Sequence, residues 1–190
     1  MPRTPVAQTP VERKDSTVSQ IATEDNVEHG AAATVIADER DVKGRPDHYW
    51  DALTSGDRLR SPGLTITEAH LVNWAGLTGD WVSLHLDADY ARQTPFGQRI
   101  GHGPLTLSVA LGLMTQTGYF THVVAWLGLE EVRAVSPVFI GDTVHVEAVV
   151  EGARETKKPG SGLWSLRYTV LNQRGETVMT FVSRFLIARR

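Results

Sequence analysis

Three long runs in the second half of the chain alternate between apolar and polar positions, which is typical of half-buried strands. They span residues 143–151, 163–171 and 177–187. Their apolar faces hold Val144, Val146, Ala148 and Val150; Trp164, Leu166, Tyr168 and Val170; and Met179, Phe181, Phe185 and Ile187. Polar stretches at 155–161 and 172–175 separate the runs and predict hairpins. Residues 123–135 precede them as one long strand or two short ones, so the pattern predicts an antiparallel meander.

The segment 104–120 is apolar on most sides of a helix, so it predicts a buried central helix. Its apolar residues include Leu105, Leu107, Val109, Ala110, Leu111, Leu113 and Met114. The small residues Ser108 and Gly112 would let other backbone approach closely, and packing is the first role expected of Ser108. One buried helix followed by a meander predicts an α+β fold in which the sheet wraps the helix.

The region before this helix is less regular. Residues 63–66 predict a short strand, and Thr67 is placed to cap a short helix that ends between Gly76 and Gly79. Residues 80–100 look loop-rich, with Asp87 capping one or two helical turns.

The first 44 residues differ from the rest in composition. They contain three prolines, many polar and charged residues, and no aromatic residue. Such a segment buries too little apolar surface to offset the entropy of ordering it. We therefore predict a disordered tail at 1–44 and a single domain at 45–190.

Charge and cysteine content exclude several classes of protein. A net charge of −3 gives no reason to expect nucleic acid or a membrane surface as partner. The absence of cysteine excludes disulfides, thiolate chemistry and cysteine-bound zinc, and it fits a reducing, cytoplasmic location. No apolar run approaches the roughly eighteen residues of a membrane span.

The stretch 79–103 carries the candidate chemistry. Asp80 precedes His85 by five positions, and Gly103 follows His102 at the start of the predicted central helix. A carboxylate and an imidazole near free helical N–H groups can move protons beside a carbonyl oxygen. The alternatives are a turn role for Asp80, an interior packing role for His85, and a turn role for Gly103. We expect His102 to be structural rather than catalytic.

No metal site is expected from the histidine spacing. His70, His122 and His145 are scattered and show no paired spacing. Asp142 is expected to belong to a turn.

Several motifs together resemble one known family. They are WAGLTGD at 74–80, LHLD at 84–87, PFG at 95–97, IGHG at 100–103 and GDTV at 141–144. These motifs resemble the MaoC-like, or R-specific enoyl-CoA hydratase, family of hotdog folds, over residues 49–187. The chain departs from that family at Val82-Ser83, where an Asn-Pro pair is common, and at Gly101, where alanine is usual. The lost amide leaves reaction rate and substrate choice open.

The resemblance implies a hotdog fold and a reversible syn addition of water to an enoyl thioester, with a role in fatty acid metabolism. In that family the catalytic groups match Asp80, His85 and the backbone N–H of Gly103, which would stabilise the thioester oxyanion. The substrate would carry coenzyme A or the phosphopantetheine of a carrier protein, and no other cofactor is expected. Ser108, His102, Arg99 and Arg133 are the predicted substrate contacts.

The resemblance also implies pairing of subunits, so we expect a homodimer or a dimer of dimers. Two alternatives stay open. A hotdog thioesterase would place its acid on the central helix, but residues 104–120 contain no Asp or Glu. A non-catalytic acyl-thioester-binding partner subunit would keep the groove without turnover.

Overall fold

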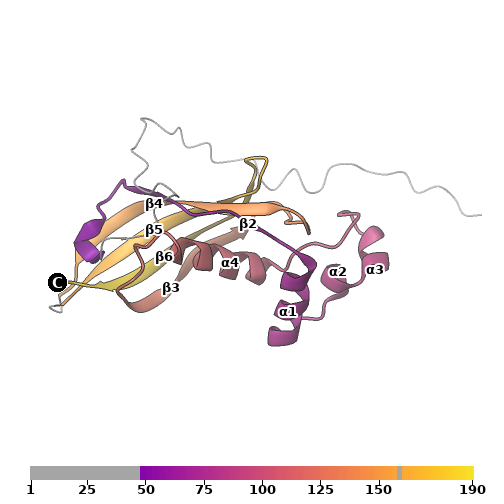
Figure 1. The fold of residues 1–190 in the computed structure, drawn as a ribbon, viewed down its shortest axis with the longest axis horizontal. Helices are drawn as coiled ribbons and strands as arrows, with labels where there is room; N and C mark the ends of the chain where they lie inside the picture. Colours follow the sequence, from indigo (N-terminus) through magenta and orange to yellow (C-terminus); the bar gives the residue numbers. More distant parts are fainter. Residues whose placement is uncertain (1–47, 158–159) are drawn as a thin grey trace, which may run out of the picture. The chain divides into compact units, whose positions relative to one another are not determined.

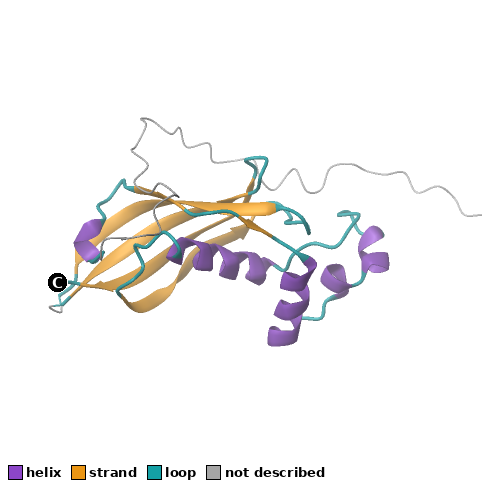
Figure 2. Cartoon of the chain, viewed as in Figure 1, coloured by secondary structure: helices purple, strands orange, loops and turns teal. Residues whose placement is uncertain are grey.

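The computed structural model describes residues 48–157 and 160–190. The tail predicted at 1–44 lies outside these residues. The elements in chain order are η1 (Trp50–Ala52), β1 (Arg58–Arg60), β2 (Leu64–Thr65), α1 (Glu68–Thr78), α2 (Ser83–Leu86), α3 (Ala88–Arg92), α4 (Gly103–Thr115), β3 (Val123–Ala134), β4 (Thr143–Glu155), β5 (Ser161–Leu171) and β6 (Thr177–Ala188). Figure 2 shows one sheet with α4 along one of its faces.

The sheet is antiparallel, and β4, β5 and β6 form the predicted meander. The meander prediction is wrong for β3, which precedes β4 in the chain but crosses over to pair with β6. The strand order of the sheet is β1-β4-β5-β6-β3, and β2 pairs with β4 off this path. The predicted inner faces are the observed ones, because Val144, Val146, Ala148 and Val150 all have no exposed surface. The pairing of Val146 with Val170 keeps the apolar faces of β4 and β5 on the same side.

β3 is one long strand at the edge of the sheet. Its pairing with β6 shifts register three times. Gly128 and Glu131 adopt positive φ angles of 143° and 52° at these irregularities. The strand presents exposed apolar side chains, among them Val124, Trp126 and Leu127. The edge is therefore long and apolar in its first half, whereas its second half carries exposed charged side chains such as Glu131 and Arg133.

α4 lies along one face of the sheet (Figure 1). Leu105, Ala110, Leu113 and Met114 are buried. The helix ends at Thr115, short of the predicted end at residue 120, because Gly118 turns the chain with a φ of 88°.

The other face of α4 differs from the expectation of a helix buried on most sides. Ser108 and Gly112 are exposed in the single chain, and a Cβ added at Gly112 would meet no atom within 4 Å. The close packing expected at Ser108 is therefore absent among the described residues.

Three short helices, α1 to α3, lie beyond the amino end of α4 (Figure 1). Thr67 caps α1 in a reciprocal capping box with His70, and Gly79 ends the helix in the left-handed conformation at φ 77°. Asp87 accepts hydrogen bonds from the backbone N–H groups of Asp89 and Tyr90 and so caps α3, as predicted. The sequence analysis missed α2, which is only four residues long. No helix in residues 48–157 and 160–190 is long and apolar enough to cross a membrane.

Candidate active site

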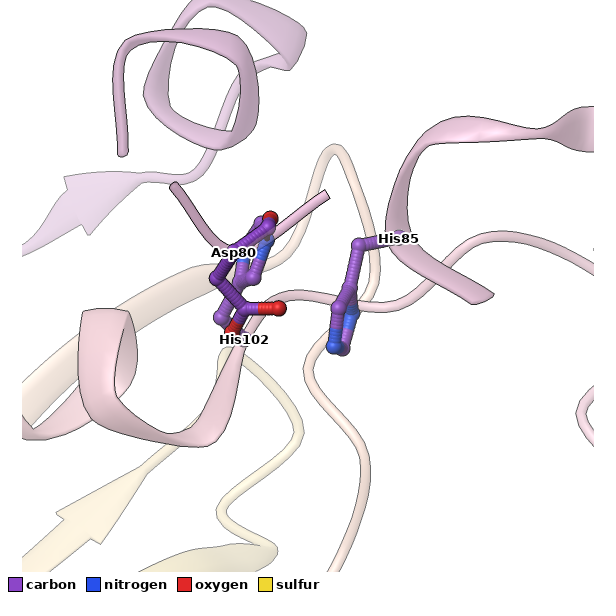
Figure 3. Close-up of side chains that lie close together, drawn as sticks. All are labelled: Asp80, His85 and His102. Carbon is purple, nitrogen blue, oxygen red and sulfur yellow. Dashed lines mark hydrogen bonds between the residues drawn. The ribbon is translucent and has the colours of Figure 1, made fainter. Parts of the chain in front are cut away.

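Asp80, His85 and His102 form a cluster at the amino end of α4 (Figure 3). One ligand-type atom from each residue lies within 4.8 Å of the other two. Asp80 follows the end of α1, His85 lies in α2, and His102 immediately precedes α4. The structure thus brings together the predicted Asp80/His85 pair and adds a second imidazole.

The backbone of Asp80 makes two polar contacts that fix its position. Its N–H donates to Thr78 Oγ1 at 3.3 Å, and its carbonyl oxygen lies 3.2 Å from His102 Nε2. The carboxylates of Asp57, Asp87 and Asp142 accept local backbone N–H bonds. Among the described residues, the Asp80 carboxylate has no such bond. The local turn role considered for Asp80 is therefore not what this geometry favours.

His85 is oriented by one hydrogen bond. Its Nδ1 lies 2.8 Å from the carbonyl oxygen of Ile100. A carbonyl only accepts, so Nδ1 carries the proton, and in the neutral ring Nε2 is left with a lone pair. His85 is half-buried, so Nε2 is the ring nitrogen that can exchange a proton with a ligand.

His102 is fully buried, with no exposed surface. Its ring lies against the His85 ring, with centroids 3.9 Å apart and planes tilted by 31°. Burial and the neighbouring His85 lower the pKa of His102, outweighing the opposing effect of Asp80. The ring is therefore neutral near pH 7. A ring without exposed surface offers a substrate no contact in this structure, which differs from the substrate contact predicted for His102.

Gly103 is the first residue of α4. The N–H groups of the first helical turn have no acceptor within the helix, and the helix dipole favours negative charge near them. The φ of Gly103 lies outside the left-handed range, and an added Cβ would meet nothing within 4 Å. Neither a turn nor protein packing therefore requires glycine at this position, which leaves open space beside the N–H.

The other predicted contacts do not converge on the cluster. Arg99 pairs with Glu68 at 2.8 Å, and its hydrogen bond and charge lower the pKa of Glu68. Arg133 is exposed near the end of β3. Ser108 lies further along the open face of α4. Their substrate roles stay predictions.

Asp142 belongs to a turn, as predicted. It is 5% exposed and accepts hydrogen bonds from the Phe139 N–H, Gln173 and Arg174. Burial raises its pKa, but these bonds and the Arg174 charge outweigh burial and hold the pKa below its ordinary value.

The cluster has the composition of a metal site, which the histidine spacing did not reveal. Two imidazoles and a carboxylate are common metal ligands. His85 Nδ1 and His102 Nε2 each lie within hydrogen-bonding distance of a backbone carbonyl. This leaves the lone pairs on His85 Nε2 and His102 Nδ1, which is also the arrangement of a histidine that binds a metal. That no metal is needed stays a prediction.

An apolar cavity of about 360 Å³ opens along the C-terminal half of α4. It is lined by Leu111, Gly112, Thr115, Phe120, Val123, Trp126, Tyr168 and Phe185. No sequence pattern predicts this cavity, because its walls come from four separate elements and the loop after α4.

A sheet wrapped over one central helix defines the class of this protein as a hotdog fold. A solved structure from Mycobacterium tuberculosis, described as a double hotdog fold, matches with a TM-score of 0.67 at 26% identity and covers 75% of this chain and 44% of that one. The profile of the family described as MaoC like domain matches residues 52–170. The chain belongs to this MaoC-like domain family.

Relatives of known name agree with this assignment. Protein MaoC of Klebsiella aerogenes is 34% identical over 125 residues, which cover 63% of this chain and 37% of that protein. The (R)-specific enoyl-CoA hydratase of Rhodospirillum rubrum is 32% identical over 114 residues, covering 58% of this chain and 75% of that one. The MaoC-like dehydratase structure from R. rubrum has a TM-score of 0.66 at 28% identity and covers 75% and 97% of the two chains. The chain thus spans only about a third of the Klebsiella protein.

Proposed function

We propose that the chain catalyses the reversible syn addition of water to a 2-enoyl thioester carried by coenzyme A or a carrier protein. The observation that carries this proposal is the proximity of Asp80 and His85, whose ligand-type atoms lie within 4.8 Å beside the first residue of α4. The names of relatives such as the (R)-specific enoyl-CoA hydratase support the same chemistry.

The reaction needs a proton to leave water and a proton to reach the α-carbon. As the water oxygen bonds to the β-carbon, the pair accepts one proton from the water. The α-carbon then takes one proton from the pair, so the protonation of the pair is restored. His85 exchanges its proton through Nε2, because Nδ1 is tied to the Ile100 carbonyl. Dehydration follows the same steps backwards.

Negative charge that develops on the thioester oxygen needs a donor. The Gly103 N–H supplies it at the positive end of α4, and the open space at Gly103 admits the thioester. Gly103→Pro tests this role because it deletes the N–H, and we expect kcat to fall by about 10²- to 10³-fold. Proline also adds a ring before Pro104 and in the space proposed for the thioester. Gly103→Ala, which adds a Cβ to the same space but keeps the N–H, is therefore the control, and it should lose less kcat than Gly103→Pro.

The apolar cavity is the proposed site for the far end of the acyl chain. Its walls are almost entirely hydrophobic and aromatic, and it lies on the same helix as Gly103. Apolar pockets with few polar groups are typical of lipid-like ligands.

We further propose that two copies pair through β3. This strand ends the sheet order, and its exposed apolar residues, together with the open face of α4, form a surface that pairing would cover. Pairing would also remove an exposed edge strand, which is an aggregation hazard.

One assay separates the candidate functions. Crotonyl-CoA is incubated with the protein while enoyl absorbance and free thiol are followed together. Loss of absorbance without thiol release supports hydration, and thiol release would support the thioesterase alternative. That alternative is already disfavoured, since α4 carries no acidic residue. Binding without turnover of crotonyl-CoA or of dodecenoyl-CoA would instead favour the non-catalytic partner.

Asp80→Asn and His85→Gln identify the catalytic pair within this assay. Each keeps the size of the side chain and removes its proton-exchanging atom, so kcat should fall by about 10²- to 10⁴-fold. Asp89→Asn, on the exposed surface of α3, is the matched control and should leave kcat unchanged. Full activity in both site variants would contradict the proposed mechanism.

A further inference from the structure

We propose that His102 is a positioning residue that holds Asp80 and His85 at their working separation. It does so with its ring N–H on the backbone of one residue and its ring face against the other. This inference rests on the proposed function of the Asp80/His85 pair.

His102 occupies a position where histidine is an unusual choice. It is the residue immediately before α4, with φ −61° and ψ 137°, and its side chain makes no capping hydrogen bond. Ser, Thr, Asp and Asn are preferred at such positions because their side chains accept from the first helical N–H groups. The side chain of His102 therefore serves something other than the helix end.

The first task of the ring is a hydrogen bond to the Asp80 backbone. Nε2 lies 3.2 Å from the Asp80 carbonyl oxygen, so in the neutral ring the proton is on Nε2 and Nδ1 carries the lone pair. Nδ1 is buried and has no partner among the described residues. A phenyl ring of similar shape would avoid that desolvation cost. The hydrogen bond from Nε2–H to the Asp80 carbonyl oxygen therefore explains why an imidazole, and not a phenyl ring, occupies position 102.

The second task is to cover one face of His85. The rings lie 3.9 Å apart, while the Ile100 carbonyl fixes His85 within its own ring plane. These two contacts constrain His85 in perpendicular directions. Burial of His102 and the nearness of His85 keep His102 neutral, so it does not repel a proton arriving on His85.

Two substitutions separate the two tasks. His102→Gln can keep a donor near the position of Nε2 but has no ring, and His102→Phe keeps a ring but has no donor. With crotonyl-CoA, we expect each to lower kcat by about 10- to 100-fold with KM changed less than about threefold, because misplacing reacting groups by about 1 Å costs this much.

Thr106→Val is the matched control. Thr106 Oγ1 donates to the His102 carbonyl at 3.3 Å, so this variant perturbs the same helix start without touching the side-chain cluster. It should keep kcat. An equal loss of kcat in Thr106→Val would mean that general loosening of the helix start explains the data, and it would overturn the proposal.

A double-mutant cycle gives a further readout that a purely structural role would not move. Because His102 is proposed to act through Asp80 and His85 as a pair, Asp80→Asn combined with His102→Phe should lose less kcat than the product of the two single losses. Additive losses would overturn the proposal.

A spectroscopic measurement keeps this test independent of activity. Nitrogen-15 NMR of histidine-labelled protein should show His85 protonated at Nδ1 in the wild type and in His102→Phe, which keeps the covering ring, and a mixture of tautomers in His102→Gln, which lacks it. An unchanged His85 signal in His102→Gln refutes positioning of His85, even if the chain hydrates enoyl thioesters. A changed signal in a chain that hydrates none would count against the proposed function alone.

Discussion

Gly112→Leu should shorten the acyl chain that the protein accepts. Gly112 lines the apolar cavity, and a side chain added there meets no protein atom within 4 Å. The new leucine would therefore fill space that is open to a ligand. It should exclude the far end of a long acyl chain and leave a short one undisturbed.

The distance along α4 from Gly103 to Gly112 determines which acyl chain lengths are affected by the substitution. Gly112 is nine positions after Gly103 (112 − 103), so it lies about 13 Å along the helix axis at about 1.5 Å per residue. An extended chain advances about 1.2 Å per bond, since three backbone bonds cover about 3.5 Å. A chain of about eleven bonds reaches the cavity, as in dodecenoyl-CoA, whereas crotonyl-CoA ends well short.

The expected loss follows from the methylenes displaced. A leucine side chain would exclude roughly two or three, at about 0.8 kcal/mol each. This is about 2 kcal/mol, or about thirtyfold in kcat/KM for dodecenoyl-CoA. The assay compares kcat/KM for dodecenoyl-CoA and crotonyl-CoA in the wild type, Gly112→Ala and Gly112→Leu. Gly112→Ala should give a small effect, because it adds one methyl group.

An unchanged ratio of the two substrates in folded Gly112→Leu would show that the acyl chain does not enter this cavity. Equal losses for both substrates would show that the leucine disturbs the whole site. Either result would refute the assignment of the cavity.

Two further predictions concern stability and assembly. Asp142→Asn should lower the free energy of unfolding at pH 7 by about 2 kcal/mol, because buried bonds to a charged carboxylate are lost. Since the folded pKa of Asp142 lies below its ordinary value, its stabilisation is complete above about pH 4 and is lost as the pH falls through the folded pKa. Urea denaturation from pH 7 to pH 3 should therefore show a flatter curve for Asp142→Asn, and a parallel curve would contradict this. Leu127→Glu, on the exposed edge of β3, should convert a dimer into a monomer in light scattering. Leu77→Glu, on α1 and 82% exposed, should not, and a dimer in both variants would exclude the β3 interface.

The strands of the sheet were predictable because burial on one face imposes a period of two. β4 shows this from Val144 to Val150 without exception. β3 left two alternatives open, because the positive φ angles of Gly128 and Glu131 interrupt its alternation inside one strand. The four-residue helix α2 is too short to produce a periodic pattern, so it was read as loop.

The candidate site was predictable only in part. Asp80, His85 and Gly103 were found through motif resemblance together with the chemistry of their side chains. The role of His102 was not, because stacking against His85 depends on how the segment after α1 folds back onto the start of α4. The unusual presence of histidine at a helix start was the one available signal. The cytoplasmic location and the homodimer stay predictions.

The bonds from Ile100 and Asp80 that fasten α2 and α1 to the start of α4 have a consequence for motion. Every group proposed to handle protons sits outside the sheet, on segments joined to it by few contacts. Transient detachment of these segments from the start of α4 would abolish the proposed catalytic activity while the sheet remained folded. Amide exchange at residues 80–86 should then be faster than in β4 to β6, and a ligand that bridges the two parts should slow it.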